Sequence, residues 1–160
     1  MNAVALRAEL AVANYLATAN WSASGAGTPT CLTSYSRGLY DDPDDQDSMP
    51  NFPRLVVSTN SARPMQRTDL TCEVEIAVEL QLSADDTDEA AVLTTVQVLD
   101  NLILPLFDDT GASALDAAAN DPSGPFTAQF AAPLDFGGSS ISNRSRTFTR
   151  TFTLFCSATI

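Results

Sequence analysis

Residues 72–82 read Cys-Glu-Val-Glu-Ile-Ala-Val-Glu-Leu-Gln-Leu, and this stretch decides the fold. Every even-numbered position is apolar, whereas the odd-numbered positions carry glutamate, alanine or glutamine. This alternation predicts a β-strand, because successive side chains of a strand point to opposite faces of the sheet. One face is expected to be buried, and the face that carries Glu73, Glu75 and Glu79 is expected to be wet.

The end of the chain shows the same alternation. Over residues 147–160 one face carries Phe148, Phe152, Leu154, Cys156, Ala158 and Ile160, and the other carries Thr147, Thr149, Thr151 and Thr153. Shorter strands are predicted at 54–59, at 126–130 and, on a weaker pattern, within 32–40. Residues 60–69 are expected to form a long hairpin loop.

Two helices are predicted. Residues 2–18 are rich in alanine, the best helix former, and contain no glycine or proline. The second helix follows the long strand, where Asp86 and Glu89 have capping-box spacing. Pro105 is expected to end or kink this helix. Its apolar stripe comprises Val92, Val96, Leu99, Ile103 and Leu106, and Leu93 and Leu102 are expected to widen it.

The order of these elements predicts an α+β fold, with a mostly antiparallel β-sheet packed against one or two α-helices. The length of 160 residues suits a single domain, 1–160, with loop insertions around 22–50 and 108–145. The acidic run 41–47 is expected to be a solvated loop. It lacks the glycine and the bidentate glutamate of a calcium-binding loop.

The composition excludes several kinds of chemistry. Twenty acids, eight arginines, no lysine and no histidine give a net charge of −12, which disfavours nucleic-acid binding as the main task. Without histidine there is no imidazole base for a serine or cysteine nucleophile, and a zinc site has few ligands. No glycine-rich phosphate-binding motif is present. We therefore expect no catalytic residues, no metal and no cofactor, and no run of apolar residues predicts a membrane span.

Two groups of reactive side chains remain. Glu73, Glu75 and Glu79 lie near one another and could in principle exchange protons, but alternating acids are typical of a wet strand face. Cys72 and Cys156 fall on apolar strand faces, where buried thiols are expected. A disulfide between them is the alternative if the two strands pair. The cysteine pattern favours synthesis in the cytoplasm.

The arginines form small basic islands in an acidic chain. Arg63 and Arg67 lie in the expected hairpin loop, and Arg144, Arg146 and Arg150 lie at the start of the last strand. Such islands suit contacts with acidic surfaces of sister subunits. Arg150 is in register with the apolar face, so it is expected to have an acidic partner or to lie at an interface.

Taken together, the N-terminal helix, the strand at 54–59, the long strand at 70–82, the helix after Asp86 and the C-terminal strand resemble the tail-terminator proteins of long-tailed bacteriophages. This resemblance implies a structural virion protein without catalytic residues. It implies a homo-oligomeric ring, usually of six copies, that caps the finished tail tube and ends tail polymerisation. The implied partners are the tail tube protein and the head–tail connector or stopper protein. Assembly would take place in the host cytoplasm.

Six copies at −12 each would carry −72, so DNA would pass through such a ring without sticking to it. We hypothesise that Glu73, Glu75 and Glu79 contribute to an acidic lumen. Two other hypotheses stay open. The chain could be another neck, head–tail connector or head-completion protein of a phage, or a small binding or enzymatic domain that uses a cleft beside the sheet.

Overall fold

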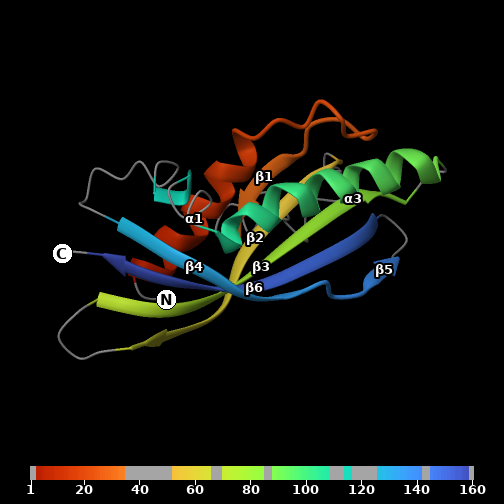
Figure 1. Cartoon of the computed structure of the whole chain (residues 1–160). Coiled ribbons are helices and arrows are strands. Elements are labelled where there is room, and N and C mark those ends of the chain that lie inside the picture. Colours follow the sequence, from red (N-terminus) through yellow and green to blue (C-terminus); the bar gives the residue numbers. More distant parts are fainter. Residues whose placement is uncertain are drawn as a thin grey trace, which may run out of the picture.

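The computed structural model describes residues 3–34, 52–65, 70–84, 88–108, 114–116, 126–141 and 145–158. The helices lie on one face of a curved sheet (Figure 1). The elements in chain order are α1 (Ala3–Ala17), β1 (Thr30–Thr33), β2 (Arg54–Pro64), β3 (Leu70–Ser83), α3 (Glu89–Ile103), the 3-10 helix η1 (Leu104–Phe107), β4 (Phe126–Asp135), β5 (Ser139–Ile141) and β6 (Ser145–Ala158).

The described strands form one six-stranded sheet in the order β1-β2-β3-β6-β4, and β5 pairs with β6. Among the strand pairs of the described residues, β1–β2 alone is parallel. The predicted α+β class and the mostly antiparallel sheet are therefore confirmed.

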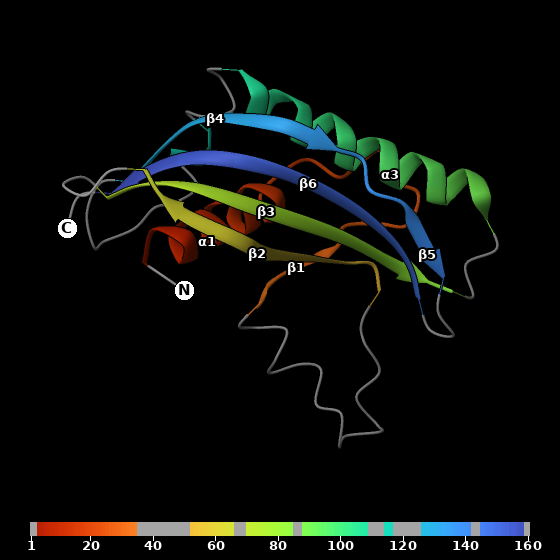
Figure 2. The same cartoon turned by 90° about the horizontal axis from the view of Figure 1, so that it is seen from below.

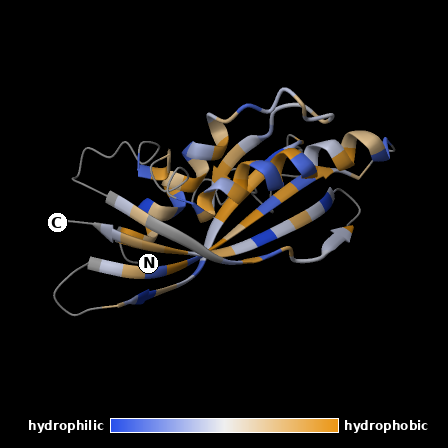
Figure 3. Ribbon diagram, in the orientation of Figure 1, coloured by the Kyte–Doolittle hydropathy of each residue, from blue (hydrophilic) through white to orange (hydrophobic). Residues whose placement is uncertain are grey.

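Strand β3 occupies the centre of the sheet, between β2 and β6. Its register with β6 places Ile76 opposite Phe152 and Leu80 opposite Phe148. The even-numbered side chains of β3 from residue 72 to residue 82 are buried, as the alternation predicted; they are Cys72, Val74, Ile76, Val78, Leu80 and Leu82. Figure 3 shows apolar and polar residues alternating along the strands.

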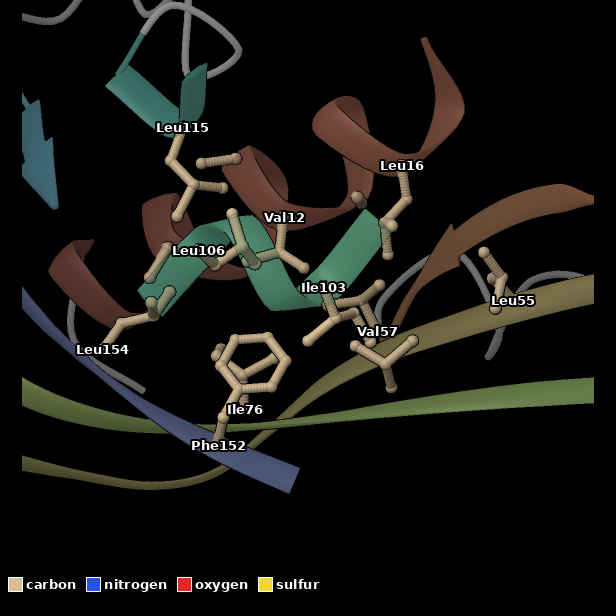
Figure 4. Packing of buried hydrophobic residues seen from close by; sticks show 14 of the residues in the cluster. Val12, Leu16, Leu55, Val57, Ile76, Ile103, Leu106, Leu115, Phe152 and Leu154 are labelled. Atoms are coloured by element: carbon tan, nitrogen blue, oxygen red, sulfur yellow. The ribbon is translucent and has the colours of Figure 1, made fainter. Parts of the chain in front are cut away.

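Both helices cover the apolar face of the sheet. Helix α1 contacts β1, β2, β3 and β6, and η1 contacts β4, with α3 on that side of the sheet (Figure 2). The two helices meet where the Tyr15 hydroxyl donates a hydrogen bond of 2.6 Å to the Leu102 carbonyl oxygen. One hydrophobic core fills the space between the layers (Figure 4), and its members include Val12 and Leu16 of α1, Ile103 of α3, Leu106 of η1 and Phe152 of β6.

Three sequence-based expectations need correction. The N-cap of α3 is Asp88, whose side chain accepts hydrogen bonds from the backbone N–H groups of Ala90 and Ala91, and not Asp86. Leu93 does not widen the buried stripe, because it is 67% exposed. Strand β2 continues to Pro64, past a register shift between Thr59 and Ser61, so the expected long loop begins later.

A further expectation, for Pro105, is confirmed, and several others concern residues outside the described ranges. Pro105 does end the helix, since α3 stops at Ile103 and gives way to η1. The loop at 41–47 and the residues Arg67, Asp86, Arg144 and Ile160 lie outside the described residues.

The segment Glu89–Phe107, which comprises α3 and η1, is long and apolar enough to cross a membrane by length and composition alone. The sequence contains no uninterrupted apolar run that predicts this. In the fold the segment contributes Leu99, Ile103 and Leu106 to the core and accepts the hydrogen bond from Tyr15. One face of the segment therefore packs into the core, and 28% of the segment is buried.

Candidate functional site

The sheet face opposite the helices carries the three glutamates singled out from the sequence. We call this surface the polar sheet face; it comprises Glu73, Glu75 and Glu79 of β3 and Thr147, Thr149, Thr151 and Thr153 of β6. The register places Glu75 opposite Thr153 and Glu79 opposite Thr149, so carboxylates and hydroxyls lie side by side across the two strands. All seven side chains are partly exposed. The structure therefore brings the predicted acidic residues together on one face.

Two carboxylates of this face accept hydrogen bonds from side-chain amides. The Asn60 side-chain amide donates to Glu75 over 3.1 Å, and the Gln81 amide donates to Glu79 over 3.2 Å. Within the described residues neither Glu73 nor Glu75 forms an ion pair. Arg63 lies opposite Glu73 in the register of β2 and β3, yet no ion pair joins these two side chains.

One end of the polar sheet face is buried, whereas the sequence predicted a solvent-exposed face. Near β1, the side chains of Arg54, Val56, Ala77 and Gln81 are all buried. Arg54 Nε donates to the Gln81 side-chain oxygen over 2.5 Å, and the guanidinium lies 5.9 Å from the centre of the Phe52 ring. No sequence pattern pointed to Arg54, because its pairing with Gln81 depends on the register of two strands.

Arg150 is used within the chain. It is buried on the apolar face of β6 and forms two hydrogen bonds with Asp100 of α3, from Nε to Oδ1 at 2.5 Å and from the terminal nitrogen to Oδ2 at 3.1 Å. Its guanidinium also lies 5.1 Å from the centre of the Phe136 ring. The expected acidic partner is thus found, and Arg150 is removed from the set of candidate interface residues because its charge is satisfied inside the subunit.

The other described arginines remain at the surface or near it. Arg63 is exposed on the β2–β3 hairpin, next to the exposed Met65. Arg146 is half-buried opposite Leu82, and its Nε makes no hydrogen bond. These two arginines lie on separate parts of the sheet, so they do not form one basic site.

A buried glutamate on α1 was not recognised from the sequence. Glu9 is fully buried and accepts hydrogen bonds from both the backbone N–H and the hydroxyl of Ser34, each at 2.6 Å. Its other oxygen accepts from the Thr59 hydroxyl at 3.1 Å. The signal in the sequence that could have indicated its burial was an acidic residue among apolar helix positions. Glu9 joins α1 to the end of β1 and to β2.

The cysteines are unsuited to nucleophilic chemistry at neutral pH. Cys72 lies opposite Cys156 in the register, and both are buried, free thiols. Burial raises the pKa of Cys156 to about 12, with smaller contributions from Cys72 and Asp116. Burial also raises the pKa of Cys31 to about 11. Both groups are therefore neutral near pH 7, when the thiolate would be the reactive form.

Within the described ranges, no three histidine, cysteine, aspartate or glutamate side chains are grouped so that they could hold a metal ion. A scan against protein-family models gave no match, and a search of curated proteins found no match either. The functional interpretation therefore depends on the geometry and charge of the polar sheet face. Its carboxylates and hydroxyls can repel anions and take part in hydrogen bonds with a neighbouring protein.

Proposed function

We propose that this chain is a structural virion protein that forms a ring, of about six copies in the resembling family, at the end of a phage tail tube. The ring caps the tube, ends its polymerisation and provides the surface to which the head connector binds. DNA passes through the ring without specific binding. The copies themselves, the tail tube protein and the connector or stopper protein are the partners.

One observation carries this proposal. The central strand presents Glu73, Glu75 and Glu79 on a single face away from the helices, and a row of threonines extends this face onto β6. A sheet that turned this face toward a central channel would line the channel with carboxylates. DNA phosphates would then be repelled at close range, and the repulsion would weaken as salt is added.

The net charge supports the same arrangement. A chain with −12 gives a ring of six copies a charge of −72. Binding to DNA requires cations that displace the counterions of the phosphates, and arginine supplies all the basic side chains of this chain. Of those on the described sheet, Arg54 and Arg150 are buried and engaged with Gln81 and Asp100.

The decisive experiment adds the purified protein to polymerising tail tubes and follows tube length and tube ends by electron microscopy. We expect tubes of limited length with a ring at one end. Tubes of unchanged length with bare ends contradict the capping function. A ring bound elsewhere in the particle shifts the assignment to another neck component.

The position of the glutamates is tested separately. In a reconstruction of the ring, Glu73, Glu75 and Glu79 are expected on the inner wall. The triple variant E73Q/E75Q/E79Q removes three charges per copy without removing the side chains, and we expect rings of this variant to retain DNA fragments at low salt that wild-type rings release. Glutamates on the outer wall, or equal DNA retention, contradict the acidic lumen.

A further inference from the structure

Among the described arginines, Arg146 alone combines a nitrogen shielded from solvent with the lack of any partner. Its side chain is half-buried, and its Nε is buried without a hydrogen bond. Arg54 and Arg150 are bonded to side chains of the same chain. Arg7 has an interaction partner, and Arg63 is exposed. A guanidinium that loses part of its hydration without gaining an acceptor is costly, so an added acceptor would stabilise Arg146.

Arg146 lies in a row of side chains that leads from the core to the surface. The register places it between Leu82 of β3 and Ile141 of β5. Residues that pair directly point to the same face of a sheet, so these three side chains share the face that carries the helices. Leu82 is 1% exposed, whereas Ile141 is 72% exposed and all three residues of β5 are exposed. The arginine therefore stands between a buried and an exposed apolar side chain.

Helix α3 brings Leu93 to the same part of β6. Its Asp100 is bonded to Arg150 of β6, and α3 runs in the same direction as β6 (Figures 1 and 2). Leu93 precedes Asp100 by two helical turns on one helix face, about 10 Å. Arg146 precedes Arg150 on one strand face by about 13 Å. Leu93, which is 67% exposed, and Arg146 therefore lie at the same end of the contact between α3 and β6.

A third exposed apolar side chain borders this region. The Phe136 ring centre lies 5.1 Å from the Arg150 guanidinium, and Phe136 is 53% exposed. We call Arg146 together with Leu93, Phe136 and Ile141 the Arg146 patch. It lies on the helix side of the sheet, away from the polar sheet face, and it joins one unpaired cation to three exposed apolar side chains.

Within the described residues, no acid of this chain neutralises Arg146. The carboxylate of Asp100 is engaged by Arg150. Glu89 and Gln97 of α3 are exposed and give the patch a polar border, and Glu89 forms no ion pair in the described part of the chain. The cation at the centre of the patch is therefore available to an acid from another molecule.

This combination fits a segment that carries one carboxylate flanked by apolar side chains. A carboxylate accepts two N–H bonds from a guanidinium at once, and apolar neighbours would cover Leu93 and Ile141. A chain of net charge −12 repels a polyanion such as nucleic acid, and it repels a membrane with anionic lipids in the same way. We infer that the Arg146 patch binds an acidic, partly apolar peptide segment of a partner protein. This inference does not depend on the proposed ring, because the patch and the polar sheet face lie on different sides of the sheet.

The test uses a pair of blocked tripeptides as probes, acetyl-leucyl-aspartyl-leucinamide and its asparaginyl counterpart, which differ only in the carboxylate. Each peptide is titrated into the isotope-labelled full chain and followed by two-dimensional NMR. We expect the aspartyl peptide to shift the backbone signals of Ile141 and Arg146 in a saturable way. The asparaginyl peptide should bind at least roughly tenfold more weakly, because hydrogen bonds to a charged group are worth about a factor of ten or more in affinity.

Variants of the full chain locate the contact. R146M is expected to weaken binding of the aspartyl peptide at least roughly tenfold, and R146K should retain part of the affinity, because lysine keeps the charge but lacks the planar fork. I141S should weaken binding roughly fivefold through lost apolar contact. The matched control is R63M, which removes the same charge from the exposed β2–β3 hairpin and should leave binding within about twofold.

Thermal melting separates recognition from a role in the fold. R146M is expected to melt no lower than the wild type, because the Arg146 Nε already lacks an acceptor. A clearly lower melting temperature would show that Arg146 stabilises the fold, and the inference would then be wrong.

Three other results would also overturn the inference. They are the absence of saturable shifts, equal binding of the two peptides, and equal losses in R63M and R146M. Inorganic phosphate that displaces the aspartyl peptide at equal concentration would show a site for small anions and not for a peptide segment. The ring is judged separately, since tail tubes left bare by a protein that binds the aspartyl peptide would contradict the proposed function alone.

Discussion

At the scale of single residues, the buried pair of Arg150 and Asp100 joins the sheet to α3. A buried arginine that loses its carboxylate partner is left with an uncompensated charge, which is costly. Because the Asp100 side chain is 23% exposed, we expect D100N to lower the free energy of unfolding by only about 2 kcal/mol. Urea unfolding measures this change.

The control for this prediction is D135N, since Asp135 is exposed at the end of β4. Its effect is expected to stay within about 0.5 kcal/mol. The double variant D100N/R150M should recover part of the loss, because it removes the orphaned charge. Additive losses in the double variant would show that the two side chains are not coupled.

The buried thiol of Cys156 predicts a dependence of stability on pH. Its pKa rises from an ordinary value of 9.0 to about 12 in the folded chain, so the unfolded chain loses this proton at lower pH than the folded chain does. The contribution to stability is therefore complete below pH 9 and is lost as the pH rises toward 12. Over this range we expect the free energy of unfolding to fall less steeply with pH in C156A than in the wild type. The two slopes should differ by up to about 1.4 kcal/mol per pH unit. Equal slopes for C156A and the wild type would show that Cys156 does not cause the pH dependence.

At the scale of elements, the position of α3 depends on a close contact with the loop after α1. A Cβ atom added at Gly25 would lie 2.5 Å from the Ala91 Cα atom and 2.7 Å from the Thr94 hydroxyl oxygen. The nearest atom belongs to the backbone of α3, so the helix must move. We expect G25A to destabilise the chain by about 2 kcal/mol, measured by thermal or urea unfolding. The matched control is G138A, whose added Cβ meets nothing within 4 Å; equal effects of the two substitutions would argue against this contact.

The N-terminus of α3 offers a second test at this scale. The Asp88 side chain accepts hydrogen bonds from Ala90 and Ala91 at 3.1 Å and 3.2 Å. We expect D88A to lower the free energy of unfolding by about 1 kcal/mol. D86A tests the capping box expected from the sequence, and a larger loss in D86A than in D88A would reverse the assignment of the cap.

The sequence predicted those elements whose pattern is local and strong. The alternation in β3 and β6 and the stripe of α3 followed directly from the spacing of apolar residues. The cap of α3 was misplaced because several acids precede the helix and local spacing alone does not choose among them.

Features that depend on contacts between distant residues were harder to predict. The burial of Gln81 and its bond to Arg54 depend on the pairing of β2 with β3. The position of Arg150 on the apolar face was visible in the sequence, but Asp100 as its partner required the placement of α3 over β6. The row of glutamates was predicted because it lies on one strand.

At the scale of the whole molecule, the two layers separate charge from apolar surface. The polar sheet face carries the carboxylates of Glu73, Glu75 and Glu79, and the helical layer exposes Leu6, Leu10, Leu93 and Leu104. Because copies of charge −12 repel one another, we expect self-association to strengthen as salt rises from low to physiological concentration. Light scattering across a salt series measures this trend, and weaker association at higher salt would indicate that ion pairs hold the copies together.

The most direct test of the ring is electron microscopy of the purified protein, alone and mixed with tail tubes, supported by native mass measurement. We predict closed rings with an acidic channel that occupy one end of each tube. A protein that remains a single chain at high concentration and leaves the tube ends empty would contradict the account.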